Sequence, residues 1–168
     1  MRIIAGRLKG RVLRGPTGPG VRPTSDRLRE TLFNVLRDRV DGARVLDAFA
    51  GTGAVGLEAL SRGAAHATFV ERDRRTAALI EENAATCGCP GDVTVVRDDF
   101  LRMSGRATAL GPFDLVWLDP PYDTPDLAAA LTVARGVIAP DGLVVLEHSR
   151  RRESPLDVGG LVRRGMAT

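Results

Sequence analysis

The chain alternates short apolar runs with longer amphipathic stretches from residue 44 to residue 148. Each run is rich in valine, leucine or phenylalanine, which is typical of a strand buried on both faces of a sheet. Strands that alternate with helices predict an α/β sandwich with a mainly parallel sheet and helices on both of its faces. The predicted strands cover residues 44–50, 66–71, 92–98, 113–119 and 142–148, and the predicted helices cover 54–63, 73–87 and 124–139, with a shorter helical stretch near 100–109.

The first 40 residues follow a different pattern. Residues 2–14 alternate loosely and include two glycines, which predicts a short basic β-hairpin, and residues 15–24 form a glycine- and proline-rich linker. A helix is expected over residues 25–40, capped by Thr24 or Ser25. We therefore divide the chain into an extension, residues 1–22, and one larger domain, residues 23–168. The apolar stripe of the helix comprises Leu28, Leu32, Phe33, Val35 and Leu36.

Charge is distributed unevenly along the 168 residues, although the net charge is only +3. Residues 1–44 carry 11 basic and 4 acidic side chains, a net +7, whereas residues 45–148 carry 8 and 15, a net −7. This division favours a polyanionic partner for the basic end and a cationic or amine-bearing ligand for the acidic body. A solvated basic tail is the alternative interpretation of the first segment.

Composition also limits the classes of function. No stretch approaches 18 apolar residues, so we expect no membrane span. The basic start lacks the apolar segment and the cleavage site of a secretory signal. Cys87 and Cys89 are too few for a four-ligand zinc site. We therefore expect a cytoplasmic protein with reduced thiols and no metal.

A glycine-rich loop follows the first predicted strand of the larger domain. Gly51, Gly53 and Gly56 match the pattern G-x-G-x-x-G, and Glu71 ends the next predicted strand, 20 residues after Gly51. This spacing is typical of a nucleotide site in which the acid accepts hydrogen bonds from ribose hydroxyls. A dinucleotide cofactor and a tight turn that serves only packing are both compatible with the glycines alone.

Asp47 distinguishes between the possible nucleotides. It stands at the end of the strand, four residues before Gly51, where a carboxylate would repel a pyrophosphate. It would attract a cationic ligand such as S-adenosylmethionine, which carries ammonium and sulfonium groups. Asp99, at the end of the third strand, is placed to accept a bond from the adenine amino group, and Asp98 is the weaker candidate. Helix capping is the alternative role for each of these three aspartates.

The fourth predicted strand ends in the sequence Asp-Pro-Pro-Tyr, which borders the same crevice. Methyl transfer to an exocyclic base amine requires acceptors that orient the lone pair of the nitrogen. The Asp119 carboxylate and the Pro120 carbonyl could provide such a pair, with the proline ring fixing its geometry. Tyr122 could stack against an extruded base. A strand-end turn is the structural alternative.

The segments "VLDAFAGTGAVGLEALSRGA", "FVERD" and "DLVWLDPPY" resemble the amino-directed class I S-adenosylmethionine-dependent methyltransferases. Together with "RIIAGRLKGRVL" and "VRPTSDRLRETLFNVL", they resemble the RsmD family, the bacterial 16S rRNA guanine-N2 methyltransferases. The resemblance extends to about residue 150. It implies a Rossmann-like sandwich and a cytoplasmic enzyme, expected as a monomer, that methylates a guanine of the small ribosomal subunit or an assembly intermediate.

The resemblance also implies roles for individual residues. The cofactor site would include Asp47, Ala48, Gly51, Gly53, Glu71 and Asp99. The base pocket would be formed by Asp119, Pro120, Pro121 and Tyr122. RNA phosphates would be contacted by Arg2, Arg7, Lys9, Arg11 and Arg14, and Arg22 would lie near the cofactor and the incoming RNA.

One part of the chain departs from the family pattern. The family continues into a Tyr-Gly-Asp-Thr-like turn and a final strand pair, whereas this sequence reads "LVRRGMAT", so we expect shortened C-terminal strands. Three other functions stay open at this stage. They are an adenine-N6 DNA methyltransferase, an inactive RNA-binding relative and a nicotinamide oxidoreductase, the last disfavoured by Asp47.

Overall fold

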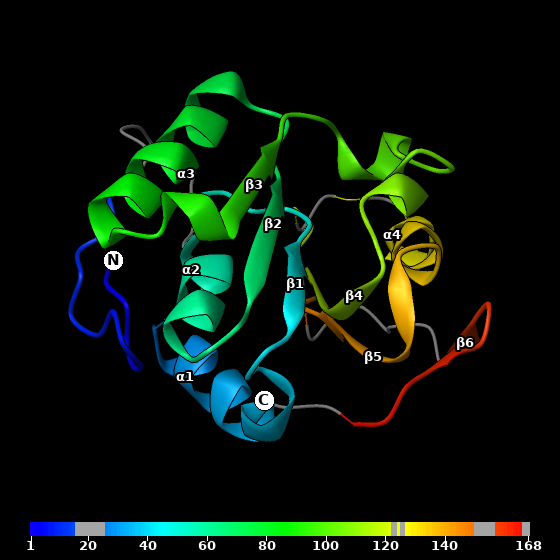
Figure 1. The fold of residues 1–168 in the computed structure, drawn as a ribbon. Helices are drawn as coiled ribbons and strands as arrows, with labels where there is room; N and C mark the ends of the chain where they lie inside the picture. Colours follow the sequence, from blue (N-terminus) through cyan, green and yellow to red (C-terminus); the bar gives the residue numbers. More distant parts are fainter. Residues whose placement is uncertain (16–25, 122–123, 125–126, 150–156, 166–168) are drawn as a thin grey trace.

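The computed structural model describes residues 1–15, 26–121, 124, 127–149 and 157–165. Five parallel strands form the central sheet, and four helices and a small C-terminal hairpin surround it (Figure 1). Four single-turn 3-10 helices, η1 to η4, lie in the connections. The elements are α1 (Asp26–Val35), η1 (Arg37–Arg39), β1 (Arg44–Asp47), α2 (Ala54–Ser61), β2 (His66–Val70), α3 (Arg74–Cys87), η2 (Pro90–Asp92), β3 (Val93–Val96), η3 (Phe100–Arg102), η4 (Ala107–Ala109), β4 (Phe113–Leu118), α4 (Leu127–Arg135), β5 (Ile138–Leu146), β6 (Asp157–Val158) and β7 (Leu161–Val162).

The strand order in the sheet is β3-β2-β1-β4-β5, and every pairing is parallel. The chain builds outward from β1 to β3 and then returns to place β4 on the other side of β1. The reversal of direction between β1 and β4 is a topological switch point, and ligands of open α/β sheets bind in the crevice beyond the strand ends at such a point. The predicted α/β sandwich with a parallel sheet is confirmed.

Helices cover both faces of the sheet, as predicted. Alternate residues of β4 point to opposite faces: Leu115 and Trp117 join one hydrophobic cluster, and Val116 and Leu118 join the other. The first cluster is completed by α1, α2, α3 and residues 1–13, and the second by η3, η4 and α4. Both faces of the central strands are therefore apolar, which explains why the sequence shows short apolar runs without polar alternation.

Residues 1–15, which we call the arm, do not form the predicted β-hairpin. The arm does turn back on itself, and Ile3 N donates to Arg11 O at 2.9 Å while Leu13 N donates to Met1 O at 3.0 Å. The only strand-like pairing of the arm is a single antiparallel bridge between Arg2 and Val12. The reason is that other backbone groups of the arm are bound by side chains of the larger domain, in place of a second strand.

Glu58, on α2, is one anchor of the arm. Its carboxylate oxygens accept hydrogen bonds from Ile4 N at 2.8 Å and Ala5 N at 3.1 Å. Glu58 is fully buried and is balanced by two arginines: Arg62 Nε lies at 2.8 Å and the buried Arg29 Nε at 3.8 Å. A buried carboxylate requires such compensation because desolvation of a charge is costly. The arm is thus a fixed part of the domain.

Several predicted boundaries differ from the structure. Of the expected stripe, Phe33 in α1 and Leu36 just after it are buried, but Val35 is 73% exposed, and Arg29 is buried although it was not part of the stripe. The helix predicted over residues 124–139 ends at Arg135, because β5 already begins at Ile138. The helical stretch near residues 100–109 consists of the two 3-10 turns η3 and η4.

At the C-terminal end, β6 and β7 pair only with each other in the part of the chain described. Arg135 Nε donates to Gly159 O at 2.9 Å and so attaches this hairpin to α4. No helix among the described residues is both long and apolar enough to cross a bilayer. Likewise, the described residues contain no group of three or more metal-binding side chains, and both cysteines are free thiols.

Candidate active site

Three acidic residues meet at the carboxyl ends of the central strands. The register of the sheet places Asp47, the last residue of β1, between Phe69 of β2 and Trp117 of β4. Glu71 and Asp119 each follow these partners by two residues, so they flank Asp47 beyond the strand ends. Glu71 and Asp119 both raise the pKa of Asp47 through charge repulsion, which requires that the three carboxylates lie in one neighbourhood.

The glycine loop lies next to these acids and is held by one of them. Gly51 N donates to Glu71 Oε2 at 2.9 Å, and Asp73 N donates to Glu71 Oε1 at 2.8 Å. Gly51 and Gly53 have φ angles of +52° and +75°, a region that glycine adopts without strain. Apart from Gly51 itself and its two chain neighbours, no described atom lies within 4 Å of the position that a Cβ on Gly51 would take, so the loop borders open space at this residue.

Gly56 has a different role from the two other glycines. It lies in α2, and a Cβ at this position would stand 2.3 Å from the ring of Phe69 on β2. The third glycine of the pattern therefore permits close packing of the helix on the sheet, which is the function expected for it in nucleotide-binding folds.

Asp47 is 2% exposed, and burial raises its pKa to about 7 against the opposing effect of a hydrogen bond from Gly56 N. That bond, at 3.2 Å, joins its Oδ2 to the first turn of α2, so Asp47 stabilises the helix start as the capping alternative supposed. The second oxygen of the carboxylate, Oδ1, accepts no hydrogen bond from the described residues. Helix support and ligand binding are therefore compatible roles.

Asp99 also combines two possible roles. Its Oδ1 accepts from Leu101 N at 3.1 Å and caps the 3-10 turn η3, and its Oδ2 lies 3.6 Å from Arg102 Nε. Asp98 accepts from Asp99 N at 2.8 Å and pairs with Arg106 at 3.1 Å. Both residues are half-buried at the end of β3. The capping alternative for Asp99 is thus realised, and its predicted contact with adenine stays a prediction.

The Asp-Pro-Pro-Tyr segment follows β4, beside Asp47. Asp119 is half-buried, Pro120 is buried and Pro121 is exposed. The Pro121 carbonyl accepts a hydrogen bond from Thr124 N at 2.8 Å, which closes a turn after the two prolines. Tyr122 lies outside the described residues, as does Arg22 of the predicted RNA contacts. The described part of the segment therefore lies at the predicted crevice.

The basic residues of the arm are only partly available for RNA. Arg7 pairs with Asp92 at 2.9 Å, and Arg14 lies 3.3 Å from Glu82. Both pairs are exposed, so each contributes little stability but reduces the positive potential of the arm. Arg2, Lys9 and Arg11 complete the predicted set. All three are exposed, and the described residues give none of them an ion pair of its side chain.

Asn83, on α3, was not foreseen from the sequence. Its fully buried amide accepts from Arg14 N at 2.8 Å and donates to Arg14 O at 3.0 Å and to Thr52 O, in the glycine loop, at 3.1 Å. One side chain therefore connects the end of the arm to the glycine loop. The sequence does contain one indication of this role. Asn83 shares a helical face with Ile80 and Cys87, where an apolar residue would be expected.

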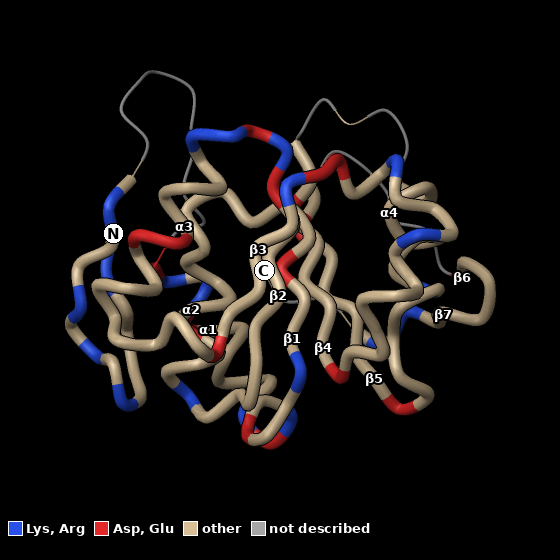
Figure 2. Tube along the Cα trace, turned by 45° about the horizontal axis from the view of Figure 1, so that its top comes forward, with Lys and Arg blue, Asp and Glu red and all other residues tan. Residues whose placement is uncertain are grey.

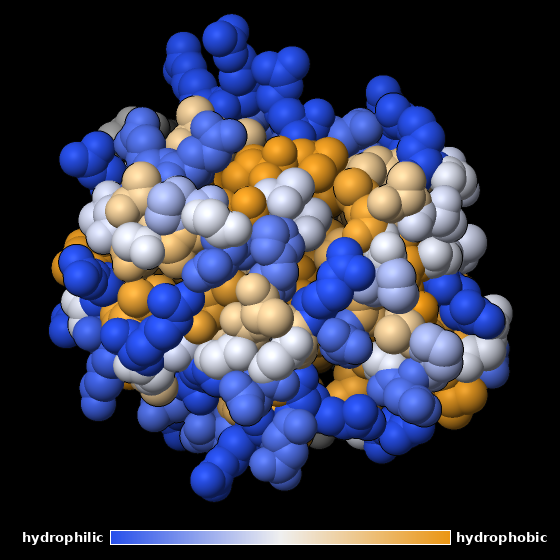
Figure 3. Space-filling model, viewed as in Figure 1, coloured by the Kyte–Doolittle hydropathy of each residue, from blue (hydrophilic) through white to orange (hydrophobic). Residues whose placement is uncertain are grey.

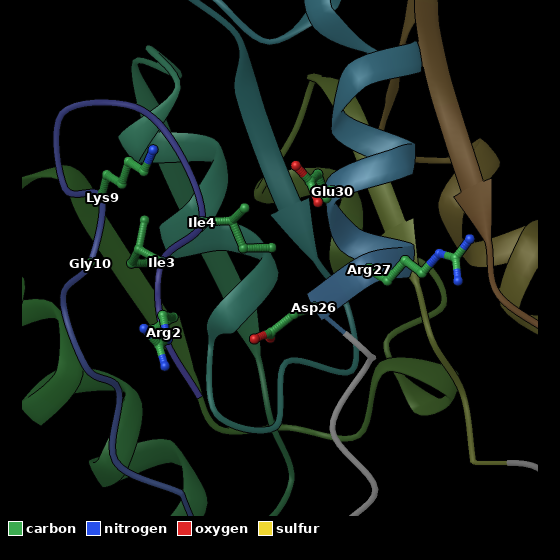
Figure 4. Close-up of a pocket in the computed structure, with 8 residues that line it drawn as sticks. All are labelled: Arg2, Ile3, Ile4, Lys9, Gly10, Asp26, Arg27 and Glu30. Carbon is green, nitrogen blue, oxygen red and sulfur yellow. The ribbon is translucent and has the colours of Figure 1, made fainter.

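A surface pocket of about 330 Å³ lies between the arm and the start of α1 (Figure 4). In the close-up, Arg2, Ile3 and Lys9 project from the arm on one side, and Asp26 faces them from the first turn of α1. The strand-end acids do not contribute to its lining. The pocket is therefore separate from the crevice beyond the sheet.

The strand order, the glycine loop and the acids at the strand ends define a class I methyltransferase-like fold, in which ligands bind beyond the strand ends at the switch point. Comparison with known proteins then identifies the family: the chain belongs to the family described as Conserved hypothetical protein 95, whose sequence profile matches residues 1–164. This assignment confirms the resemblance to the RsmD family.

Individual relatives agree with this assignment. Ribosomal RNA small subunit methyltransferase D of Escherichia coli (strain K12) is 42% identical over 149 residues, which cover 88% of this chain and 74% of the relative. The protein of the same name from Haemophilus influenzae is 36% identical over 153 residues, 89% of this chain and 79% of the relative. A solved structure of a hypothetical protein from Thermus thermophilus superposes with a TM-score of 0.80 at 37% identity, over 93% of this chain and 90% of the other.

Proposed function

We propose that this protein transfers a methyl group from S-adenosylmethionine to the exocyclic N2 amine of a guanine in 16S rRNA. The observation that carries the proposal is the convergence of Asp47, Glu71 and Asp119 at the switch point, next to two prolines, in a chain of this family. An acid-lined crevice disfavours a pyrophosphate and favours a cationic donor and an amine acceptor. Membership of the RsmD family selects rRNA as the acceptor in preference to DNA.

The residues of the crevice fit S-adenosylmethionine, which supplies an electrophilic methyl group on a sulfonium centre. The open space beside Gly51 lets a ligand approach the loop backbone closely. Glu71 already holds the loop through Gly51 N, and the remaining lone pairs of its carboxylate can accept from ribose hydroxyls. Asp47 would stabilise the positive charge of the donor, and Asp99 would accept from adenine. Ala48 and Gly53 complete the predicted lining.

The acceptor amine would be positioned by Asp119 and by the carbonyl of Pro120. Two acceptors aimed at the two N–H groups of the amine direct its lone pair away from the base ring and toward the methyl group. The buried Pro120 and the turn closed by Thr124 N on Pro121 O restrict the backbone that presents this carbonyl. Tyr122 would stack on the extruded guanine.

The partner we propose is the small ribosomal subunit or one of its assembly intermediates, bound by the protein as a monomer in the cytoplasm. The exposed basic residues of the arm, Arg2, Lys9 and Arg11, support a polyanionic substrate. They would contact phosphates and thereby position the RNA, while the base pocket would select the guanine.

The test compares methyl transfer by the wild-type protein and by Asp119→Ala. Tritiated S-adenosylmethionine is supplied with small subunits, naked rRNA or DNA, and mass spectrometry locates the product. We expect N2-methylguanine in rRNA for the wild type and a loss of turnover of at least about 100-fold for Asp119→Ala, the scale of removing one oriented electrostatic contact. Cofactor affinity measured by calorimetry should persist. Asp141→Ala, which changes an exposed carboxylate at the start of β5, is the matched control.

Two outcomes would contradict the proposal. Near-normal turnover of Asp119→Ala would remove the assigned role of this carboxylate. Incorporation of label into DNA at adenine N6 would select the alternative methyltransferase, and binding of RNA without any incorporation would indicate an inactive relative.

A further inference from the structure

We propose that Arg72, Arg74, Arg75 and Arg97 form a second surface for the RNA backbone, separate from the arm, along the edge of the cofactor crevice. We call these four residues the rim arginines. The proposal rests on the proposed function, because it takes RNA as the substrate, and it adds the path that the RNA follows outside the base pocket.

The rim arginines stand directly beside the acids of the crevice. Arg72 follows Glu71, Arg74 and Arg75 begin α3, and Arg97 follows the last residue of β3. Because β2 and β3 are paired in parallel, the loops that follow them are neighbours at the same edge of the sheet. Figure 2 shows basic segments along the connection from β2 into α3, at the strand-end edge of the molecule.

The guanidinium groups of the rim arginines face solvent. All four residues are exposed, and within the described residues none of them forms a salt bridge or donates a side-chain hydrogen bond. Two basic residues of the arm, Arg7 and Arg14, are paired with acids instead. Figure 3 shows hydrophilic side chains that project outward from the edge where β2 and β3 end.

The acids of the same loops are directed elsewhere. Asp73 caps α3 and accepts from Thr76 N at 2.8 Å and Thr76 Oγ1 at 2.9 Å, bonds that lower its pKa and keep it ionised. Glu71 is bound to backbone N–H groups, and Asp98 pairs with Arg106. The edge therefore presents arginine to solvent and keeps its carboxylates engaged with the protein.

The positions of Arg74 and Arg75 are unfavourable for the helix itself. They occupy the first turn of α3, where the helix dipole disfavours positive charge, and the negative charge beside them is that of the N-cap Asp73. A local preference that is violated at an exposed position beside a ligand site points to a functional reason. An RNA phosphate placed on this edge would compensate the repulsion.

The two layers of charge suit two different ligands. Acids inside the crevice suit a small cationic donor, whereas the rim arginines outside it suit an extended polyanion. Arginine binds phosphate through its planar fork and gives position without base selectivity. RNA that enters over the rim arginines would reach the base pocket from the β2–β3 side of the sheet.

The test uses the double variant Arg74→Ala/Arg75→Ala in the full-length protein. The matched control is Arg37→Ala/Arg39→Ala, which removes the same charge from η1, the turn before β1 at the opposite edge of the sheet. Affinity for small ribosomal subunits is measured by filter binding from about 0.05 to 0.3 M salt, a range over which phosphate contacts change affinity strongly, and cofactor affinity by calorimetry. Melting temperatures verify that both variants are folded.

If two phosphate contacts are lost, the slope of log affinity against log salt should decrease by about 1.4, and affinity should fall by about tenfold at about 0.15 M salt. The KM for subunits should rise while kcat and the cofactor affinity stay near the wild-type values. The control should retain the wild-type slope. An unchanged slope in Arg74→Ala/Arg75→Ala, or an equal loss in the control, would overturn the proposal.

Failure of the proposed function gives a different result. In that case the wild-type protein itself would methylate no guanine in rRNA, whatever the effect of the arginine substitutions. Active wild-type enzyme with an unaffected Arg74→Ala/Arg75→Ala variant would reject the rim arginines alone.

Discussion

Replacement of Asp47 by asparagine should make the protein more stable above neutral pH. In the wild-type protein, burial raises the pKa of this carboxyl from 3.8 to about 7. The folded state therefore prefers the protonated acid, and the stability that protonation confers is fully present below pH 3.8 and is lost as the pH rises through 7. Asparagine resembles the protonated acid in shape and stays neutral, so Asp47→Asn should not show this loss.

The magnitude follows from the pKa shift. The difference between 3.8 and about 7 corresponds to about 4 kcal/mol of folding free energy that the ionised carboxylate costs at pH 8. For a domain of this size, the difference in melting temperature between Asp47→Asn and the wild type should be on the order of 10 °C at pH 8. The difference should shrink steadily as the pH falls toward 3.8, because the folded and the unfolded states of the wild type both carry the proton only below that value.

The assay is thermal unfolding of both proteins from pH 4 to pH 8.5, in the absence of cofactor. Asp47→Asn also leaves an amide oxygen that can accept from Gly56 N, so the start of α2 should be preserved. A melting difference that is the same at pH 5 and pH 8 would refute the reasoning, because Asp47 would then not titrate between these values.

Cofactor binding supplies an independent check on the same residue. A cationic donor binds the ionised form of Asp47, so binding below pH 7 should release up to one proton. The affinity of the wild type should then decline by up to about tenfold per pH unit below about pH 7. Calorimetry in two buffers of different ionisation enthalpy measures the proton release directly. Asp47→Asn should bind the cofactor more weakly and release no proton from this site.

Two further substitutions test how the framework around the site is built. Glu58→Ala removes one of the two carboxylates beside the buried Arg29, the other being Asp26 at 3.0 Å, and it also removes the acceptor of Ile4 N and Ala5 N. It should cost about 3–5 kcal/mol in chemical denaturation, whereas Glu81→Ala, at an exposed position of α3, should cost under about 0.5 kcal/mol. Equal effects would mean that the arm is not anchored by Glu58. Gly56→Ala should cost about 1–3 kcal/mol through overpacking against β2, whereas Gly91→Ala, with no described atom near its Cβ position, should be tolerated. A neutral Gly56→Ala would indicate that α2 can move away from the sheet.

Much of the fold was predictable because its signals are local. The strands are short apolar runs, the glycines need particular backbone angles, and parallel strand ends necessarily bring Asp47, Glu71 and Asp119 to one edge. The strand order alone is enough to predict that these acids lie together, and no individual side-chain contact has to be known. The same logic failed for the arm, where alternation predicted a hairpin that the structure replaces with a single bridge.

The failures share a physical cause, which is pairing between residues distant in the sequence. Arg29 lies outside the predicted apolar stripe, yet it is buried, because Glu58, 29 residues later, compensates its charge and the distant Arg2 O accepts a hydrogen bond from its Nη2 at 2.7 Å. Asn83 interrupts an apolar stripe because two carbonyls and one N–H from distant loops require its amide. Such partners can be recognised only once the fold has brought the segments together.

The distribution of charge acquires a different meaning once these pairs are known. The excess of basic residues at the start of the chain suggested that the arm is the main RNA-binding element. In the structure, Arg7 and Arg14 pair with acids of the domain, which reduces the positive potential of the arm, and Arg29 is buried beside Glu58. At the crevice of the acidic body, in contrast, Asp47 is buried and Glu71 is bound to backbone N–H groups, whereas exposed arginines lie along the edge. Net charge per segment therefore identifies the kind of ligand, whereas the location of the binding surface depends on which charges are already paired.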